Sequence, residues 1–394
     1  LDLDKPQYNL GKFLTEANYP YGRIIQAYGT DFSMVLAKKS PFPTSVMADW
    51  ETAKKCDRRK FPIGVDDLGN PVYWDTKTTP HLLISGKSGS GKSSASQIVI
   101  AEALLKGEDI ILIDPSKGCI DFTQWAKPKA LAFVGLYQLR ETEAVISWAR
   151  EEMAERVRIN NKYGVGNIFE LDPDDVEEAD RKHLKPLNIL FDEFNSYLQE
   201  TGKTTQNPQK DMQIANDNAA VSATNASIAR TMSALSKIIV QGRTAGIRCI
   251  FGAQRLTMDD MKKYNGNAFF RSLGRILLGM DSPAGVVSAQ NLSEANRTQK
   301  SLKNEDGLIP VGRGMYESMQ GTLMAVQTWY SGGQDELAKL VADIPNPEPI
   351  DYQQYMPRAA EQFTKLDVED IKEIFTSNNG SENVEDEDVE EEEW

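Results

Sequence analysis

The sequence predicts an α/β protein built on a mostly parallel sheet flanked by helices. Apolar runs of strand length alternate with stretches of helical periodicity, which is the pattern of βα units in a parallel sheet. Two of these runs read as buried strands: DIILID at 109–114 is apolar between its acidic ends, and LNILFD at 187–192 is apolar apart from Asn188 and its final Asp192. Strands that are buried on both faces have this composition, so we expect helices on both sides of the sheet.

The individual elements can be assigned from residue 61 onward. FPIGVDDLGNPVYWD at 61–75 predicts a hairpin, because its DDLGN centre suits a tight turn. A helix is predicted over 93–107, ending at Gly107, and a longer one with a single apolar side over 141–164. The remaining predicted elements are a helix at 227–246 and strands at 81–85, 109–114, 131–135, 187–192, 247–253, 275–280 and 322–330.

Changes in composition divide the chain into segments. Residues 1–60 are expected to form an accessory segment of short strands and helices, and residues 61–343 the main domain. The polar stretch 199–227 inside that domain is longer than an ordinary connection, so it is either a disordered insertion or a functional loop. A C-terminal extension at 344–379 and a disordered acidic tail at 380–394 are expected to follow.

Composition and charge restrict the class of protein. The chain is 40% hydrophobic and 26% charged, as soluble globular proteins are, and no apolar run approaches the roughly 18 residues that span a bilayer. Three scattered cysteines and two histidines lack metal-ligand spacing, which argues against a zinc site and fits a reduced, cytoplasmic setting. The net charge is −14, but residues 381–394 hold nine acidic side chains, and subtracting them leaves about −5. Net charge therefore does not exclude a nucleic-acid partner.

A phosphate-binding loop is predicted within HLLISGKSGSGKSSASQIVI at 81–100, which places the pattern G-x-x-x-x-G-K-[ST] between a strand and a helix. The glycines let backbone N–H groups approach phosphate oxygens, and the helix N-terminus adds partial positive charge. Lys92 is expected to neutralise the β- and γ-phosphates, and Ser93 to bind Mg²⁺ through its hydroxyl. The alternative is a glycine- and serine-rich turn without a ligand. The predicted nucleotide-binding residues are Gly86, Lys87, Ser88, Gly89, Ser90, Gly91, Lys92, Ser93 and Ser94.

An acidic pair follows the apolar strand in NILFDEF at 188–194. Asp192 is expected to bind Mg²⁺, and Glu193 to act as the general base that polarises the attacking water. The alternative is a strand end with two solvated carboxylates. Together with the phosphate-binding loop, the pair predicts an ATP hydrolase.

A third polar group is predicted at Gln254, just beyond the strand in CIFGAQRL at 249–256. An amide at this position can bridge the γ-phosphate and the attacking water, so we expect a catalytic role. A plain surface glutamine is the alternative.

In order and spacing these motifs resemble the FtsK/SpoIIIE-type DNA translocases of the RecA-like P-loop ATPase group. The resemblance covers about residues 62–330, and Ser116 before Lys117 is a departure from the family's pattern. The other segments of this chain that carry the resemblance are ILIDPSKG at 111–118, AREEMAERVRINNKYGVGNI at 149–168, GRTAGIRCIFGAQR at 242–255, GRILLGMDSPAG at 274–285 and GRGMYE at 312–317.

The resemblance implies an ATP- and Mg²⁺-dependent motor that translocates double-stranded DNA. It implies a homo-oligomeric ring, a hexamer, with ATP between neighbours and duplex DNA in the pore, contacted through its phosphates without sequence specificity. An arginine of the neighbouring subunit would stabilise the transferring phosphoryl group. Arg275 is the first choice for this catalytic finger, with Arg243 and Arg271 behind it, and an ion pair is the alternative for each. The expected pore cations are Lys203, Lys210 and Arg230.

Two departures favour the conjugative (Tra/Tcp-like) members of the family. About 50 residues follow the main domain, too few for the winged-helix module of chromosome-segregating members, and the insertion at 199–227 replaces a short connection. The first residue is Leu1 and not Met, so the chain is expected to be a piece of a longer protein. Because conjugative members often have transmembrane helices upstream of the motor, the resemblance implies a cytoplasmic motor at the inner face of the cell membrane, held by a segment outside this chain. The N-terminal region or the acidic tail would contact the membrane or the transfer apparatus.

Three other functions remain open from the sequence. A type VII-like protein secretion ATPase shares the motor, but such proteins carry several motor cassettes in tandem and this chain has one. A chromosome-partitioning DNA translocase is the second. A non-catalytic assembly subunit is the third, and the intact Lys92, Ser93, Asp192 and Glu193 argue against it.

Overall fold

The computed structural model describes residues 18–19, 23–28, 31–198, 212–257, 259–261, 264, 266–279 and 286–357. The acidic tail, most of the predicted C-terminal extension, Lys203 and Lys210 lie outside the described residues. Predictions made for them therefore stay predictions.

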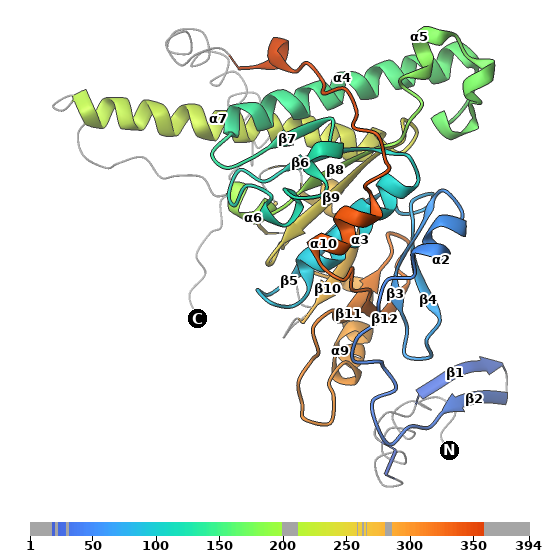
Figure 1. Ribbon diagram of the computed structural model, residues 1–394. Coiled ribbons are helices and arrows are strands. Elements are labelled where there is room, and N and C mark those ends of the chain that lie inside the picture. Colours follow the sequence, from blue (N-terminus) through green and yellow to red (C-terminus); the bar gives the residue numbers. More distant parts are fainter. Residues whose placement is uncertain are drawn as a thin grey trace, which may run out of the picture.

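A ten-stranded sheet forms the centre of the molecule, in the order β4-β3-β12-β11-β10-β5-β9-β8-β6-β7 (Figure 1). Neighbouring strands from β10 to β7 pair in parallel, whereas every pairing from β10 to β4 is antiparallel. This confirms the predicted α/β class with a mostly parallel sheet. The strands are β3 (Lys60–Val65), β4 (Pro71–Asp75), β5 (His81–Gly86), β6 (Asp109–Ile113), β7 (Ala132–Val134), β8 (Leu187–Phe191), β9 (Ile247–Ala253), β10 (Leu273–Leu278), β11 (Arg313–Glu317) and β12 (Leu323–Thr328).

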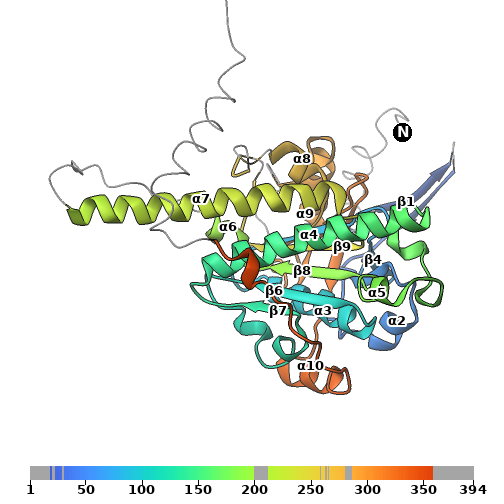
Figure 2. The ribbon, with the colours of Figure 1, turned by 90° about the horizontal axis from the view of Figure 1, so that it is seen from above.

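Helices cover both faces of the sheet, as its apolar strands require. The long helices α4 (Leu139–Tyr163) and α7 (Met212–Gln241) lie side by side on one face, and α3 (Lys92–Leu105) lies on the other (Figures 1 and 2). Successive strand residues alternate between the two cores: Leu83, Ile111, Ile189 and Phe251 face α4 and α7, while Leu82, Ile110, Leu190 and Ile250 face α3. Burial of apolar surface on both sides is the main stabilising contribution to this sheet.

The helix α7 begins at Met212, well before the predicted start at residue 227, so the prediction of a loop or disorder for residues 212–227 is wrong. The stretch has few large apolar residues, but it is rich in alanine, the strongest helix former. Where α7 reaches α4, Ser227 Oγ donates a hydrogen bond to Glu143 at 2.6 Å, and Arg230 Nε lies 2.6 Å from the same carboxylate. A pore role for Arg230 stays a prediction.

The N-terminal part contains the short strands and helix that were expected, and one strand of the sheet was missed. β1 (Arg23–Tyr28) and β2 (Asp31–Val35) form a separate two-stranded antiparallel sheet. The helix α2 (Trp50–Lys55) packs against the main domain, where Ala53 is buried with Ile98 and Trp329. The missed strand is β11, whose sequence RGMYE has a charged residue at each end and one glycine, so its composition does not indicate its burial between β10 and β12.

Shorter helices complete the described chain, and none of its helices is long and apolar enough to cross a membrane. The remaining α-helices are α5 (Glu178–Arg181), α6 (Phe194–Tyr197), α8 (Gly266–Arg271), α9 (Leu292–Ser301) and α10 (Gln334–Leu340). Single 3₁₀ turns occur at Ile120–Phe122, Lys127–Lys129, Ile168–Glu170, Pro173–Asp175, Ala289–Asn291 and Gln353–Tyr355.

Candidate nucleotide-binding site

A cavity of about 330 Å³ lies at the carboxyl ends of β5, β8 and β9, the edge at which parallel α/β sheets bind ligands. All the sequence-predicted site residues line it except Gly86, Ser90 and Arg275. The sequence predictions missed five further lining residues, which are Asp114, Lys117, Ile120, Asp121 and Val311.

The loop between β5 and α3 has the backbone shape of a phosphate-binding loop. Gly89 and Gly91 adopt positive φ angles of 77° and 99°, which favour glycine. A Cβ atom at Gly91 would lie only 2.9 Å from the backbone nitrogen of Gly312, whose N–H donates a hydrogen bond to the Ser90 carbonyl at 2.8 Å. The loop therefore needs a glycine at this point, and the segment before β11 fixes its position.

Two buried polar atoms of residues that line the cavity have no hydrogen-bond partner among the described residues. They are Ser94 Oγ and Glu193 Oε2. Buried polar groups are rarely left unpaired, so such a cluster indicates a ligand with polar atoms. Hydroxyl donors beside the Lys92 ammonium suit the anionic phosphates of a nucleotide, and these residues fit that group.

Lys92 brings the two predicted motifs into direct contact. Its Nζ lies 2.9 Å from Asp192 Oδ1 and 3.2 Å from Glu193 Oε1, and all three side chains are buried. Glu193 has a φ of 48°, a left-handed conformation that residues other than glycine seldom adopt. Strained backbone of this kind persists mainly at functional sites, so the conformation supports a working role for Glu193.

The electrostatics of the cluster favour charged side chains. Burial raises the pKa of Glu193, but the hydrogen bond from Lys117 and the charge of Lys92 outweigh it and hold the pKa below its ordinary value. Burial lowers the pKa of Lys92, but Asp192 and Glu193 outweigh that effect and raise it. At neutral pH Glu193 is thus a carboxylate, the form that a general base requires.

A glycine on the neighbouring strand makes room for Asp192. A Cβ atom added at Gly252 in β9 would lie 2.0 Å from Asp192 Oδ1, which is far inside van der Waals contact. Any other residue at 252 would displace the carboxylate from Lys92. The glycine stands in the sequence GAQR, where nothing in the local pattern indicates this constraint.

Asp114 and Lys117, two of the residues that were missed as site residues, form one structural unit. The carboxylate of Asp114 accepts hydrogen bonds from the backbone N–H groups of Ser116, Lys117 and Cys119, at 2.9–3.1 Å. This turn directs Lys117 toward the site, where its Nζ lies 2.6 Å from Glu193 Oε1. Burial raises the pKa of Asp114, opposed by these N–H donors. The segment IDPSKG was the available signal, but nothing in it indicates the contact with Glu193.

Gln254 lines the cavity with an exposed side chain, while its backbone is held on both sides. Its N–H donates to Asn195 Oδ1 at 3.1 Å, and its carbonyl accepts from Ser85 Oγ at 3.3 Å. The side chain is therefore placed beside the phosphate-binding loop without being tied to it. This position suits the predicted catalytic role of Gln254, which stays a prediction.

Arg275, the first choice for an arginine acting on a neighbouring subunit, is buried inside its own chain. Its guanidinium donates to Glu317 at 2.5 Å and to the carbonyl of Phe270 at 2.5 Å, and only 4% of the residue is exposed. A guanidinium that acts on a neighbour must reach the surface, so the intrachain ion pair is the correct interpretation of Arg275. Arg243 and Arg271, the other candidates, are exposed.

Comparison with known protein families and sequences gives a consistent result. The model of the FtsK/SpoIIIE family matches residues 45–258, which is more than half of the chain. The DNA translocase SftA of Bacillus subtilis is 29% identical over 136 residues, which is 34% of this chain and 14% of that protein. The DNA translocase FtsK 2 of Neisseria meningitidis is 25% identical over 233 residues, which is 53% of this chain and 20% of that protein. The chain thus matches only a minor part of these relatives' lengths.

Solved structures show the same fold at low sequence identity. The structure of the pCW3 conjugation coupling protein TcpA, in its monomer form with ATPγS, has a TM-score of 0.59 and 18% identity. The match covers 86% of this chain and 87% of that one. EssC (ATPases 2 and 3) of Geobacillus thermodenitrificans has a TM-score of 0.54 and 16% identity, over 79% of this chain and 54% of that one.

Proposed function

Because the chain belongs to the FtsK/SpoIIIE family, we propose that it is an ATP hydrolase that drives double-stranded DNA through a ring of identical subunits. The observation that carries this proposal is the contact of Lys92 with both Asp192 and Glu193 in the cavity beside the phosphate-binding loop. Two named relatives that match the chain are DNA translocases. Their function supports DNA as the substrate.

Each residue of the cluster has a specific role in this proposal. Ser93 and Asp192 hold Mg²⁺, which supplies positive charge to the phosphate oxygens. Lys92 exchanges its carboxylate partners for the phosphates of ATP, and Glu193 then accepts a proton from the attacking water. Gln254 orients that water. Lys117 stays beside Glu193 and keeps it ionised.

We further propose that the motor acts in conjugative transfer of a plasmid or integrative element. The support is the near-complete mutual coverage with the fold of TcpA, which is itself a conjugation coupling protein. A hexameric ring, a location at the inner face of the cell membrane, and contact with the transfer apparatus through the N-terminal region or the acidic tail belong to the same proposal. They are carried by the family resemblance.

The test measures ATP turnover with and without linear duplex DNA, at low and high salt. We expect strong stimulation by DNA that fades as salt rises, because pore contacts go to phosphates and release counterions. Glu193→Gln should lower turnover at least ~100-fold while nucleotide binding is retained, as the loss of a general base does. Lys92→Ala should lose nucleotide binding as well.

The same measurement separates the proposed motor from its alternatives. Turnover that is indifferent to DNA at every salt concentration would contradict a DNA motor and favour a protein substrate of the type VII-like kind. A second readout is the displacement of a third strand from a DNA triplex. Displacement that depends on ATP hydrolysis would support movement along duplex DNA, and its absence would contradict it. A variant Glu193→Gln with wild-type turnover would refute the assigned base.

A further inference from the structure

The segment just before β11 connects the nucleotide cavity to the rest of the chain. Val311 lines that cavity, and the N–H of Gly312 donates a hydrogen bond to the Ser90 carbonyl of the phosphate-binding loop at 2.8 Å. Gly312 is held in turn by Thr328 of β12, whose backbone N–H and Oγ1 both donate to the Gly312 carbonyl, at 2.7 and 2.9 Å. We call Val311 and Gly312 the loop brace, because this pair bonds directly to the phosphate-binding loop.

Gln327 of β12 holds the other residue of the loop brace. Its Nε2 donates to the Val311 carbonyl at 2.9 Å, and its Oε1 accepts from Arg313 Nε at 3.2 Å. Only 2% of Gln327 is exposed, so bulk water cannot replace a bond that is lost there. An arginine can only donate, so it fixes the orientation of the amide, with the oxygen toward Arg313 and the NH₂ group toward Val311. In the reversed orientation the amide oxygen would face the Val311 carbonyl, and two acceptors would repel each other.

Arg313 ties the loop brace to the N-terminal part of the chain. The residue is fully buried, and its guanidinium donates to the Pro43 carbonyl at 3.1 Å. The guanidinium also lies over the ring of Phe42, 5.1 Å from the ring centroid. Phe42 and Pro43 belong to the connection between β2 and α2. A continuous series of contacts therefore runs from this connection through Arg313 and Gln327 to the phosphate-binding loop.

We propose that Gln327 is a positioning residue for ATP binding, aligned by Arg313 and, through Arg313, by the connection at residues 42–43. The inference rests on the proposed function as an ATP hydrolase, and it concerns the affinity for ATP and not the chemical step. The loop brace holds the phosphate-binding loop in the shape that receives phosphates, whereas Lys92 and the acidic pair are held by contacts of their own. Movement of the N-terminal part would thereby change the affinity of the site for ATP.

The test variant is Gln327→Glu. The new carboxylate still accepts a hydrogen bond from Arg313 and pairs with its charge, so stability in urea should not fall. The same carboxylate cannot donate to the Val311 carbonyl and repels it. We expect the Kd for ATPγS, measured by calorimetric titration, and the KM for ATP to rise about 10-fold, which is the size of one lost buried hydrogen bond. The value of kcat should stay near that of the wild type.

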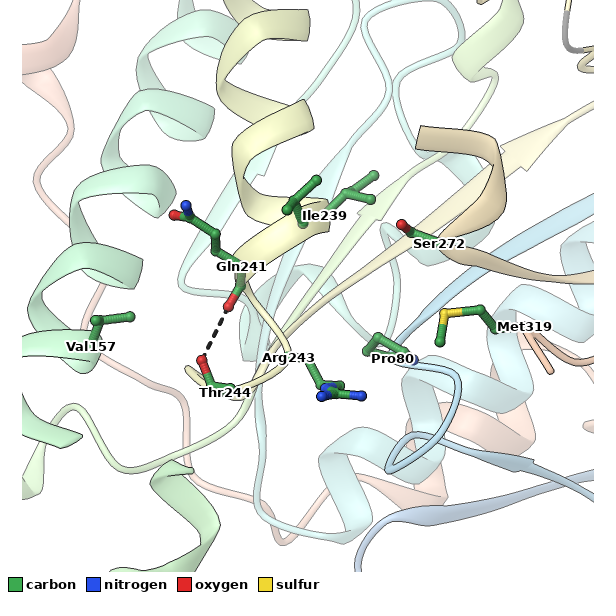
Figure 3. A pocket seen from close by; sticks show the side chains of 9 residues that line it. Pro80, Val157, Ile239, Gln241, Arg243, Thr244, Ser272 and Met319 are labelled. Carbon is green, nitrogen blue, oxygen red and sulfur yellow. Dashed lines mark hydrogen bonds between the residues drawn. The ribbon is translucent and has the colours of Figure 1, made fainter. Parts of the chain in front are cut away.

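A second cavity, of about 490 Å³, lies at the opposite edge of the sheet and supplies the matched control (Figure 3). Pro80, Thr244 and Ser272, which line it, lie just before β5, β9 and β10, whereas the phosphate-binding loop follows β5. Gln241 also lines this cavity and is exposed, and the hydrogen bond drawn at Gln241 in Figure 3 uses its backbone carbonyl, which a substitution leaves in place. Gln241→Glu therefore makes the same chemical change away from the loop brace, and its Kd and KM should equal those of the wild type.

Phe42→Ala tests the N-terminal end of the series of contacts. Loss of the ring lets the Arg313 guanidinium move, so we expect the KM for ATP to rise by about 3-fold, the equivalent of one cation–π contact. In the double variant Phe42→Ala/Gln327→Glu the series is already broken at Gln327, so the KM should equal that of Gln327→Glu alone. Independent effects would instead multiply to about 30-fold and would contradict the connection to residues 42–43.

The outcomes separate this proposal from the proposed function. Wild-type Kd and KM in Gln327→Glu would overturn the positioning role, as would an equal rise in Gln241→Glu. A lower kcat with an unchanged KM would also overturn it, because that result would place Gln327 in the chemical step. In each case wild-type turnover stimulated by DNA would leave the proposed function intact. A wild type that neither binds ATPγS nor hydrolyses ATP would instead defeat the proposed function.

Discussion

One carboxylate oxygen of Glu193, Oε1, accepts hydrogen bonds from two ammonium groups: Lys117 Nζ lies at 2.6 Å and Lys92 Nζ at 3.2 Å. Lys92 comes from the first turn of α3, and Lys117 from the turn that Asp114 holds after β6. When phosphates draw Lys92 away from the acidic pair, Lys117 remains as the cation that keeps Glu193 ionised. The pairing therefore keeps one cation beside Glu193 when Lys92 moves to the phosphates.

Lys117→Met is expected to shift the pH dependence of ATP turnover. The hydrogen bond from Lys117 is what chiefly holds the pKa of Glu193 down against burial, so removing it raises that pKa. Glu193 then becomes protonated at higher pH, and the acid limb of the pH–rate profile moves upward. The loss in turnover should be larger at pH 6 than at pH 8. Lys127→Met, outside the cavity, should leave the profile unchanged, and an unshifted profile for Lys117→Met would refute the role.

Gly252→Ala is expected to abolish turnover by displacing Asp192. The new methyl group would lie 2.0 Å from Asp192 Oδ1, so the carboxylate must leave its position beside Lys92. We expect turnover to fall at least ~100-fold, since Asp192 holds Mg²⁺ in the proposed mechanism. Gly166→Ala is the matched control, because its Cβ would meet only Glu170 Oε1 at 3.6 Å. Wild-type turnover in Gly252→Ala would contradict the packing argument.

Arg275→Ala is expected to destabilise the fold. Removing one partner of a buried ion pair leaves the other charge uncompensated, which costs about 3–5 kcal/mol of unfolding free energy. Here the charge left behind is that of the fully buried Glu317. Urea unfolding measures the change, and Lys339→Ala, from an exposed pair with Glu336, should show none that is measurable. Unchanged stability together with lost turnover would return Arg275 to the list of catalytic candidates.

His81 is expected to make stability depend on pH below neutrality. Burial lowers the pKa of His81 from 6.5 to about 4, and its Nδ1 accepts a hydrogen bond from the backbone N–H of Cys249 at 3.0 Å. The unfolded chain takes up a proton below pH 6.5, whereas the folded chain does so only near pH 4. The contribution of His81 to the free energy of unfolding is therefore complete above pH 6.5, and it decreases by about 3 kcal/mol as the pH drops to about 4.

The measurement for His81 compares unfolding free energies at several pH values. His81→Asn keeps a hydrogen-bond acceptor and removes the titration, so its stability should fall less steeply between pH 6.5 and 4. Equal slopes for wild type and variant would show that other groups cause the pH dependence.

The fold class and the identity of the nucleotide site were predictable because their signals are local. Strands buried on both faces are mostly apolar, and the ends of β8 and β9 were predicted to within one residue even though β8 holds Asn188 and β9 holds Arg248. The phosphate-binding loop, Asp192 and Glu193 follow strand ends, and parallel strands place such residues at one edge of the sheet. Their meeting at Lys92 follows from the topology.

Partners that are distant along the chain were decided by the tertiary structure alone. No local pattern shows that Lys117 would reach Glu193, that Gly252 would face Asp192, or that Arg275 would be paired with Glu317. A sequence states which side chains carry charge, but whether a charge is exposed or paired depends on which strands become neighbours. For this protein the sequence determined the α/β sheet and the phosphate-binding chemistry. The order of its strands determined which cations serve the site and left Arg243 exposed at the opposite edge.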